Sequence, residues 1–383
     1  MGYEFETRIP YDFGARRRYL DLPFPTSEYE SRLRKIREMM EREDLSAFVG
    51  FGDQNDFGIL TYVAAFEPMM GRGAVVITKD AVSLVTDSAF HGEPMHSLIW
   101  RTWVEDVVLS KPSLPDFISS LKTKLPSGKV GVAGTYAFSP NSIGLNTVGV
   151  DNQFLEIKSR KTPLELDAMR EASRITSKGM QAAVKAVKLG IRETELAAIA
   201  SRIMFEEGAE RLAFHPIVVA GDRSGMKHDF PTSRKIQNDE MVYIDIGAIS
   251  RGYFSDMSRT VLVGKGTPEQ RNALETIFDI YTDLKRMIKP GVEAKKVAKQ
   301  GEYIAQSRGW LRDFWAMGHG LGTSFLELPA FTPSSVNTFA EGMVFAYEPM
   351  IVRLGLGTAV IEDTLALTVD GHESLTDCET RLW

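Results

Sequence analysis

The sequence predicts two domains, an N-terminal α/β domain over residues 1–155 and a C-terminal α+β domain over residues 156–383 with internal pseudo-twofold symmetry. Three observations support this fold class. The 383 residues exceed the usual size of one domain. Strand-like and helix-like segments alternate in the first part. In the second part, a helix start signal, two helical segments and a strand hairpin occur twice in the same order.

Composition narrows the class of protein. There are 45 Lys+Arg against 51 Asp+Glu, a net charge of −6, and 43% of the residues are hydrophobic. These values exclude a disordered chain and argue against nucleic acid or an anionic membrane as a partner, since both favour basic surfaces. No apolar run reaches the roughly 18 residues of a membrane helix. Cys378 is the single cysteine, which excludes an intramolecular disulfide and favours a cytoplasmic location.

The N-terminal domain shows the alternation of a central sheet with helices. Ser27 is a candidate helix cap for the amphipathic segment 29–43, and a second helix is expected over 114–125. This domain contains neither a phosphate-binding loop nor a set of residues with ligand spacing. Short apolar runs predict strands at 47–51, 74–77, 82–85, 104–109 and 130–132.

The C-terminal domain contains the repeated pattern. Residues 162–165 and 267–270 are both capping boxes with proline at the first helical position, and each predicts a long helix, ending near 187 and 288 respectively. A glycine-containing break and a second helix follow in both copies. In each copy, the glycine of the break lies 18 residues before the glycine that follows the second helix. These pairs are Gly190 and Gly208 in the first copy and Gly291 and Gly309 in the second.

Each copy ends in a hairpin that carries two acidic residues. If the first hairpin turns at Ser250-Arg251, Asp245 and Asp256 are directly opposed, with Cβ atoms about 5 Å apart. If the second turns about residue 355, Glu348 and Glu362 are opposed in the same way. Both pairs lie in apolar, β-branched strands.

Opposed carboxylates in an apolar sheet require a neutralising partner, because like charges destabilise a sheet and a bare buried charge is costly. One pair could be a shared-proton dyad, whereas two pairs favour metal. His319, within the glycine-rich segment 318–322, adds a nitrogen donor. Four carboxylates and one imidazole match two divalent cations, with Mn²⁺ or Co²⁺ preferred and Zn²⁺ or Fe²⁺ as alternatives. Such a site implies hydrolysis by a metal-bridging hydroxide.

These motifs resemble those of the creatinase/prolidase/aminopeptidase P/methionine aminopeptidase superfamily, the "pita-bread" metallopeptidases. The matching segments are IDIGAISRGYFSDMSRT (244–260), GHGLG (318–322), EGMVFAYEPM (341–350) and IEDTLALTVDGHESLT (361–376). The resemblance implies a creatinase-type N-terminal domain, a pita-bread catalytic domain and a homodimer. The separate N-terminal domain makes the chain most similar to Xaa-Pro dipeptidase-like members.

The resemblance also implies roles for individual residues. Glu348 would exchange a proton with the attacking water and the leaving nitrogen, His228 would stabilise the transition state, and His215 is a candidate for the pocket wall. By analogy, the ligands of the two metal ions are Asp245, Asp256, His319, Glu348 and Glu362.

Two positions depart from the superfamily pattern where substrate is expected. Leu326 stands where peptidase members usually carry a histidine that contacts substrate. Val360 stands where many members carry an arginine. With His215, these two positions are the candidate substrate-binding residues. The apolar character of Leu326 and Val360 argues against proline-peptide specificity but not against metal-dependent hydrolysis.

The leading hypothesis is therefore a dinuclear-metal-dependent hydrolase, an Xaa-Pro dipeptidase or aminopeptidase P-like enzyme acting on small peptides. An alternative is a metal enzyme of the same fold that acts on a small non-peptide amide or related metabolite. A second alternative is a pita-bread binding protein without activity. Gly247 stands where lyase-type members carry an additional aspartate, which counts against lyase chemistry.

Overall fold

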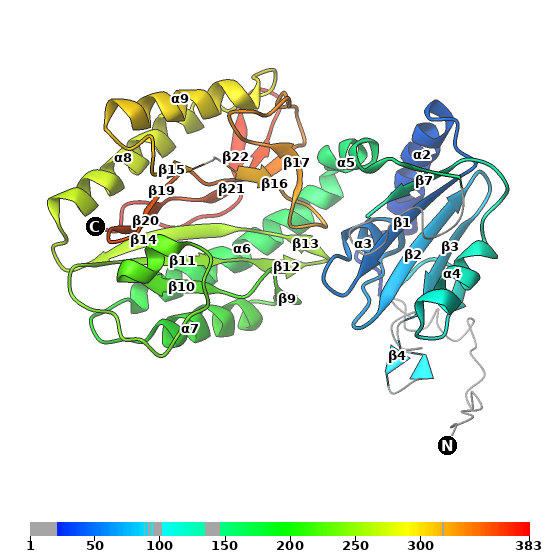
Figure 1. The fold of residues 1–383 in the computed structure, drawn as a ribbon, viewed down its shortest axis with the longest axis horizontal. Coiled ribbons are helices and arrows are strands. Elements are labelled where there is room, and N and C mark those ends of the chain that lie inside the picture. The colour runs from blue at the N-terminus through cyan, green and yellow to red at the C-terminus, as the bar shows by residue number, and fades with distance from the viewer. Residues whose placement is uncertain (1–20, 88, 91–92, 95–101, 135–145, 316–317) are drawn as a thin grey trace. The chain divides into compact units, whose positions relative to one another are not determined.

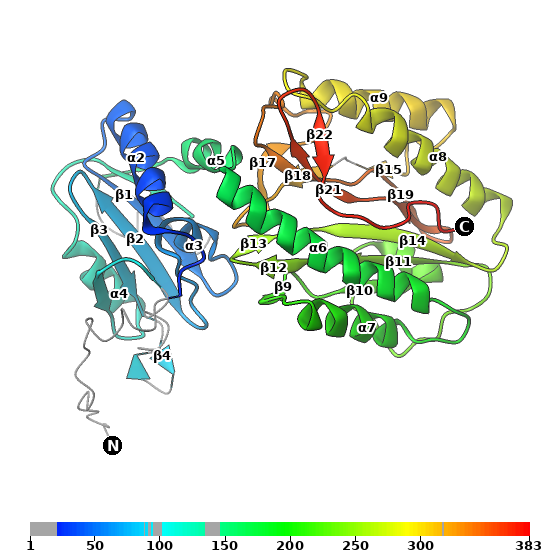
Figure 2. The ribbon, with the colours of Figure 1, turned by 180° about the vertical axis from the view of Figure 1, so that it is seen from behind.

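The computed structural model describes residues 21–87, 89–90, 93–94, 102–134, 146–315 and 318–383 (Figures 1 and 2). The chain forms two compact units, Met1–Ile157 and Lys158–Trp383. Both units are mixed α/β structures, as the sequence predicts.

A six-stranded mixed sheet in the order β6-β3-β2-β1-β7-β8 forms the centre of the first unit. Strands β1, β2 and β3 are antiparallel, while β7 and β8 continue parallel to β1 and β6 runs parallel to β3. The six strands are β1 (Ala47–Asp53), β2 (Arg72–Thr78), β3 (Val82–Thr86), β6 (Asp106–Leu109), β7 (Val130–Ala133) and β8 (Thr147–Gly149). A further pair, β4 (Ala89–Phe90) and β5 (Glu93–Pro94), forms a separate two-stranded ribbon.

Helices supply the rest of the core of this unit. They are α2 (Thr26–Arg42), α3 (Gly58–Ala64), α4 (Leu114–Lys122) and α5 (Asp151–Ser159). Helix α2 buries Ile36 and Met39 at a helical spacing against β1 and β2. The predicted cap at Ser27 is wrong, because the helix begins at Thr26, with Pro25 at the N-cap position two residues before Ser27 and no side-chain cap.

The second unit contains the predicted repeat. In the first copy, α6 (Pro163–Ala186) and α7 (Glu193–Glu206) pack on the sheet of β10 (Ile217–Ala220), β11 (Glu240–Ile246) and β14 (Met257–Val263). In the second copy, α8 (Pro268–Lys285) and α9 (Ala294–Ser307) pack on β18 (Val344–Tyr347), β19 (Met350–Arg353), β20 (Gly357–Val360) and β21 (Asp363–Leu367). Both predicted capping boxes are present, at Thr162–Glu165 and Thr267–Gln270.

The two copies share the same backbone geometry at the break between their helices. Gly190 and Gly291 both have φ 83°, a left-handed conformation that favours glycine. Their N–H groups donate to the carbonyls of Ile236 and Phe339, both at 2.9 Å. The matching conformation and hydrogen bond, one per copy, agree with the predicted pseudo-twofold symmetry.

The remaining elements of this unit are short. They are β9 (Arg211–Leu212), the 3₁₀ helix η4 (Gly221–Met226), β12 (Ala248–Ser250), β13 (Tyr253–Phe254), β15 (Phe314–Trp315), β16 (Gly318–Gly320), β17 (Glu327–Ala330) and β22 (His372–Ser374). Strand β16 lies between β17 and β18, which places the glycine-rich segment inside a five-stranded sheet.

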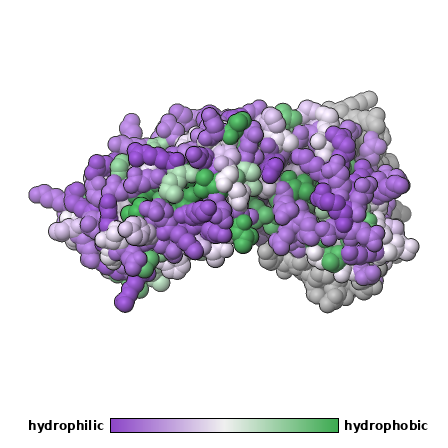
Figure 3. Space-filling view, turned by 90° about the horizontal axis from the view of Figure 1, so that it is seen from above, coloured by the Kyte–Doolittle hydropathy of each residue, from purple (hydrophilic) through white to green (hydrophobic). Residues whose placement is uncertain are grey.

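The surface carries both hydrophilic and hydrophobic residues. The face shown in Figure 3 is mostly hydrophilic, with hydrophobic side chains in small groups. In the described part of the chain, no helix has the length and apolar character needed to cross a membrane.

Candidate metal centre

The first acidic hairpin has a different register from the predicted one. Its turn lies at Arg251-Gly252, both left-handed with φ 51° and 78°, and not at Ser250-Arg251. Moving the turn by one residue moves every cross-strand partner by two. The prediction that Asp245 directly faces Asp256 is therefore wrong, because Asp245 pairs with Ser258.

A shift of two residues keeps side chains on the same face of the sheet, since strand side chains alternate with period two. Asp256 thus remains a diagonal neighbour of Asp245 on that face. The two carboxylates are therefore still close although the predicted register is wrong. Burial is the main cause of the raised pKa of Asp256, and the charge of Asp245 is the next.

The second hairpin has the predicted register. Tyr347 pairs with Asp363 and Met350 pairs with Val360, so Glu348 and Glu362 face each other between these two pairs.

The two hairpins are hydrogen-bonded to each other next to their acidic residues. Arg259 forms a bridge with Ile361, and the Glu362 N–H donates to the Ser258 carbonyl at 3.0 Å. The Thr364 hydroxyl accepts from the Asp256 N–H at 3.1 Å and donates to the Asp256 carbonyl at 2.8 Å. These bonds hold the carboxylates of both repeats at one place.

His319 reaches the same place from β16, where it pairs with Ala346. A Cβ atom at the preceding Gly318 would lie 1.8 Å from the Ala346 carbonyl oxygen, and Gly318 has φ 137°. Glycine is therefore required there for β16 to approach β18 closely enough to present the imidazole.

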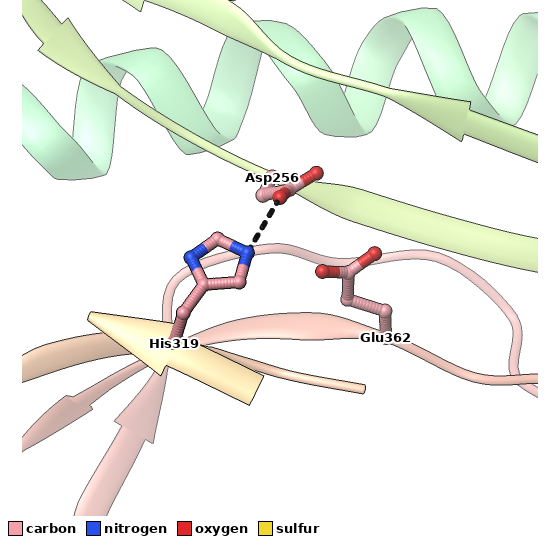
Figure 4. A group of neighbouring side chains, drawn as sticks. All are labelled: Asp256, His319 and Glu362. Carbon is pink, nitrogen blue, oxygen red and sulfur yellow. Dashed lines mark ion pairs between the residues drawn. The ribbon is translucent and has the colours of Figure 1, made fainter. Parts of the chain in front are cut away.

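Three side chains form a compact cluster in Figure 4. Asp256, His319 and Glu362 each offer one donor atom, and these atoms all lie within 4.8 Å of one another. His319 Nε2 lies 3.6 Å from Asp256 Oδ2 and 4.0 Å from Glu348 Oε1. The structure thus brings His319 together with three of the four acidic residues that the sequence singled out, and the fourth, Asp245, is the diagonal neighbour of Asp256.

Burial and mutual repulsion dominate the electrostatics of the cluster. Burial raises the pKa of Asp245 to about 6 and that of Glu348 to about 8. Burial also raises the pKa values of Asp256 and Glu362 well above their usual range, and neighbouring carboxylates add to this effect. Without a cation, the site therefore favours protonated carboxyls.

The hydrogen bonds of the cluster leave acceptor oxygens unused. Tyr243 donates to Asp245 Oδ2 and Ser258 donates to Glu362 Oε2, both at 2.6 Å. The Oδ1 atoms of Asp245 and Asp256 are buried and accept no hydrogen bond from any described residue. Buried acceptors normally have a partner. Unused carboxylate oxygens beside an imidazole nitrogen fit divalent cations, so this donor set is suitable for metal.

A cavity of about 350 Å³ opens beside the cluster. This volume is at the small end of the range for ligand pockets. Its polar lining includes Asp245, His215 and His228, and its apolar lining includes the rings of Phe214, Phe230 and Phe325.

The two other predicted substrate-binding residues do not line this cavity. Leu326 is 65% exposed, on the segment before β17. Val360 is only 1% exposed and packs with Val219, Tyr243 and Met350 behind the carboxylates.

The segment that carries His228 is held by a buried ion pair. The fully buried Glu193 carboxylate accepts from the Thr232 N–H at 3.0 Å and the Ala220 N–H at 3.0 Å, and pairs with Arg223. Arg223 also donates to Asp229 at 2.7 Å, directly after His228. These contacts fix both ends of the segment.

We expect Glu193→Gln to reduce kcat by roughly 10-fold, because it displaces His228, the residue that the sequence resemblance implies stabilises the transition state. Metal content should not change, since Glu193 does not contact the cluster. Steady-state kinetics with metal analysis test this, and Glu206→Gln, an exposed change on the same helix, is the control. Loss of metal in Glu193→Gln would contradict a role limited to the His228 segment.

The sequence did not single out every residue that contributes to the site. Tyr243 lies two residues before Asp245 on β11, so period-two spacing could have placed it on the same face. Lys227 and Phe325 carry no periodic signal. Only the structure shows that the Phe325 ring lies 4.9 Å from the His319 ring and that the Lys227 charge lowers the pKa of Glu348.

Known proteins share this architecture. The model of metallopeptidase family M24 matches residues 167–369, more than half of the chain. An Xaa-Pro dipeptidase of Pyrococcus furiosus is 32% identical over 235 residues, which cover 61% of this chain and 67% of that protein. An uncharacterized peptidase of Staphylococcus aureus is 28% identical over 243 residues, covering 63% and 68% of the two chains.

Solved structures agree over both units. The prolidase of Pyrococcus horikoshii matches with TM-score 0.80 and 25% identity, over 92% of this chain and all (100%) of that chain. The prolidase of Pyrococcus furiosus matches with TM-score 0.77 and 26% identity, over 89% and 99%. The predicted fold class and superfamily are confirmed, and the chain belongs to metallopeptidase family M24.

Proposed function

We propose that this chain is a dinuclear-metal-dependent hydrolase of the Xaa-Pro dipeptidase type. The observation that carries the proposal is the cluster of four carboxylates, three of them buried, and one imidazole, with unused acceptor oxygens on Asp245 and Asp256. The membership in family M24 and the similarity to proteins named Xaa-Pro dipeptidase and prolidase support the reaction and the substrate class.

We assign the ligand set to Asp245, Asp256, His319, Glu348 and Glu362. Bound divalent cations, with Mn²⁺ or Co²⁺ preferred, would polarise the scissile carbonyl and lower the pKa of a water molecule. Glu348 would accept a proton at its carboxylate and donate it to the leaving nitrogen. Tyr243 and Ser258 would hold the carboxylates of Asp245 and Glu362 in orientation through their 2.6 Å hydrogen bonds.

His228 would stabilise the developing oxyanion. It lines the cavity with Asp245, and burial together with the neighbouring Lys227 charge lowers its pKa. The imidazole is therefore neutral at pH 7 and can donate one N–H to an oxygen in the cavity.

We expect His228→Ala to lower kcat by about 100-fold, the usual cost of removing one oxyanion donor. Both cations should remain bound, because the proposed ligands are unchanged. Single-turnover kinetics with metal analysis check this, and His372→Ala, far along the chain in β22, is the control. Loss of a cation from His228→Ala would instead place His228 among the ligands.

The test of the whole proposal is release of amino acids from a peptide panel by metal-stripped enzyme, with and without Mn²⁺ or Co²⁺. The panel pairs Xaa-Pro dipeptides with longer Xaa-Pro peptides and with matched peptides that lack proline. Metal-dependent cleavage of the dipeptides supports the proposal. Absence of cleavage across the panel, with two cations bound per chain, would overturn it.

The alternative of a small non-peptide amide substrate is supported by Leu326 and Val360. One is exposed and apolar, and the other is buried and apolar, so neither can form the polar contacts usual at these positions. Small amides are the substrates to test if the peptides fail. Binding of cations without any hydrolysis would favour a binding protein.

We further propose that the protein is a homodimer, on the basis of the superfamily resemblance. We also propose that it is located in the cytoplasm, because it has a single cysteine. Light scattering coupled to size exclusion gives the mass of the particle, and a value of one chain at micromolar concentration would contradict the dimer.

A further inference from the structure

A buried arginine connects the two acidic hairpins. Arg259 lies on β14 and is only 1% exposed. Its Nη1 donates to the Ser258 carbonyl at 2.9 Å and to the Glu362 carbonyl at 2.6 Å. Ser258 belongs to the first hairpin and Glu362 to the second, so a single nitrogen atom joins the hairpins directly beside the proposed ligands.

The other N–H groups of this guanidinium contact the second hairpin and the segment 376–383. Nη2 donates to Asp363 Oδ1 at 2.9 Å and to the Cys378 carbonyl at 3.0 Å, and Nε donates to the Glu379 carbonyl at 3.0 Å. An arginine has five N–H donors, and here all five are used. Acceptors from three separate parts of the chain therefore hold the guanidinium in one orientation.

The segment 376–383 is attached to both copies of the repeat. In the first copy, the Leu262 N–H on β14 donates to the Leu382 carbonyl at 3.0 Å. In the second copy, Glu275 on α8 accepts from the indole N–H of Trp383 at 2.8 Å. The segment thus presents two carbonyls to Arg259 from anchors in both halves of the second unit.

The spacing of the hairpins determines whether the proposed ligands can share cations. Asp256 comes from the first hairpin and Glu362 from the second, and their donor atoms lie within 4.8 Å of each other. Removing the guanidinium would take a donor from buried acceptors in all three segments, which is costly. Lysine cannot replace it, because an ammonium offers three donors from one atom and no planar fork.

We propose that Arg259 is a positioning residue that, together with the segment 376–383, sets the spacing of the two hairpins and so the affinity of the metal centre for cations. The inference rests on the proposed function, because it takes the assigned ligands as correct. Arg259 contacts neither cation nor substrate in this role and acts through the backbone of Ser258 and Glu362. Residues that orient metal ligands in this way tune the affinity of a site.

The experiment titrates metal-stripped protein with Mn²⁺ by calorimetry. Electron paramagnetic resonance of the Mn²⁺-loaded protein gives a second readout, because two neighbouring ions produce an exchange-coupled signal. The variants are Arg259→Lys, which keeps the charge but loses the fork, and Glu275→Ala, which releases the segment 376–383 from α8. Circular dichroism checks that each variant is folded.

Two matched controls separate positioning from general destabilisation. Arg32→Lys makes the same change at an arginine that is also 1% exposed but lies on α2 in the first unit. Glu206→Ala removes an exposed glutamate on α7, as Glu275→Ala does on α8.

We expect the wild type to bind two Mn²⁺ ions with a coupled spectrum. Arg259→Lys should bind Mn²⁺ about 10- to 100-fold more weakly, the usual cost of changing a residue that orients a ligand, and should lose the coupled signal. Glu275→Ala should lose only about threefold, because Arg259 keeps its contacts with both hairpins. Both controls should have wild-type Mn²⁺ affinity, even where Arg32→Lys lowers the unfolding temperature.

Wild-type affinity and a coupled spectrum in folded Arg259→Lys would overturn the inference and leave the proposed function intact. An equal loss of affinity in Arg32→Lys would also overturn it, since general destabilisation would then be the cause. If Arg259→Lys does not fold, unchanged Mn²⁺ affinity in Glu275→Ala overturns the inference.

The wild type separates this inference from the proposed function. Absence of Mn²⁺ binding by the wild type would overturn the metal centre and the role of Arg259 together. Binding of two Mn²⁺ ions without cleavage of any peptide would overturn the peptidase function alone, because the role of Arg259 is measured by metal affinity.

Discussion

Asp256→Asn should abolish hydrolysis, with kcat at least about 1,000-fold below wild type, because the substitution removes a carboxylate central to the proposed metal centre. Asp256 is buried, and its carboxylate is among the atoms that lie within 4.8 Å of one another in the cluster. An amide is a weak ligand for these cations and carries no charge. Fewer than two cations should remain bound per chain after dialysis, as measured by elemental analysis.

The same variant should keep its fold without metal. In the metal-free protein, Asp256 is repelled by Asp245 and Glu348, so replacing it with a neutral amide removes an unfavourable interaction. We expect metal-free Asp256→Asn to unfold at a temperature equal to or above that of metal-free wild type. Added Mn²⁺ should raise the unfolding temperature of the wild type far more than that of the variant.

Asp370→Asn, in an exposed turn, is the matched control and should behave as wild type in every measurement. Full activity of Asp256→Asn at trace metal, or two retained cations, would show that Asp256 is not a ligand. Collapse of the metal-free variant would show instead that the carboxylate supports the fold.

The helices of the second unit could be predicted closely from the sequence because their boundaries are set locally. The capping boxes at Thr162 and Thr267 satisfy the first N–H groups of α6 and α8 with side chains only three residues away. The glycine breaks supply a left-handed backbone that ends the local pattern. Such signals need no knowledge of the rest of the fold.

Helix α3 was not predicted, for the opposite reason. Every one of its residues, Gly58–Ala64, is buried. A helix that is apolar on all sides has no 3.6-residue pattern, and only its packing against β1 and β2 distinguishes it from a strand.

In the metal centre, too, the features set by local sequence could be predicted, and those set by contacts between distant segments could not. The residue types and their spacing identify the acidic pairs, but the register of the first hairpin depends on Arg251 adopting φ 51°, which non-glycine residues seldom do. His319 and Asp256, which lie 3.6 Å apart, are more than 60 residues apart in the sequence, and no spacing rule predicts their contact.

The metal-free protein should lose stability as the pH rises from about 6.5 to 8. Glu348 has a pKa of about 8 in the folded protein and an ordinary value near 4.3 when unfolded. The folded state therefore binds more protons than the unfolded state across this range. Stability is fully present below the unfolded pKa and decreases until the pH passes the folded pKa.

The window limits the contribution of the histidines. Burial lowers the pKa values of His228 and His319, so these residues destabilise the folded state mainly below about pH 6.5. Between about pH 6.5 and 8 the unfolded imidazoles lose their remaining protons, which opposes the Glu348 effect by about 0.4 kcal/mol per histidine. One carboxyl with this shift costs about 2 kcal/mol over 1.5 pH units, or roughly 5 °C in the unfolding temperature of the second unit.

Calorimetry of metal-stripped protein at several pH values measures this slope. Glu348→Gln should make this slope shallower, since the amide does not titrate while Asp256 and Glu362, whose pKa values are also raised, still do. Saturating Mn²⁺ should reverse it, because cations bind deprotonated carboxylates and compete with protons. If metal-free wild type were equally stable at pH 6.5 and 8, the hairpins would tolerate four ionised carboxylates unaided, and the electrostatic reason for placing cations there would fail.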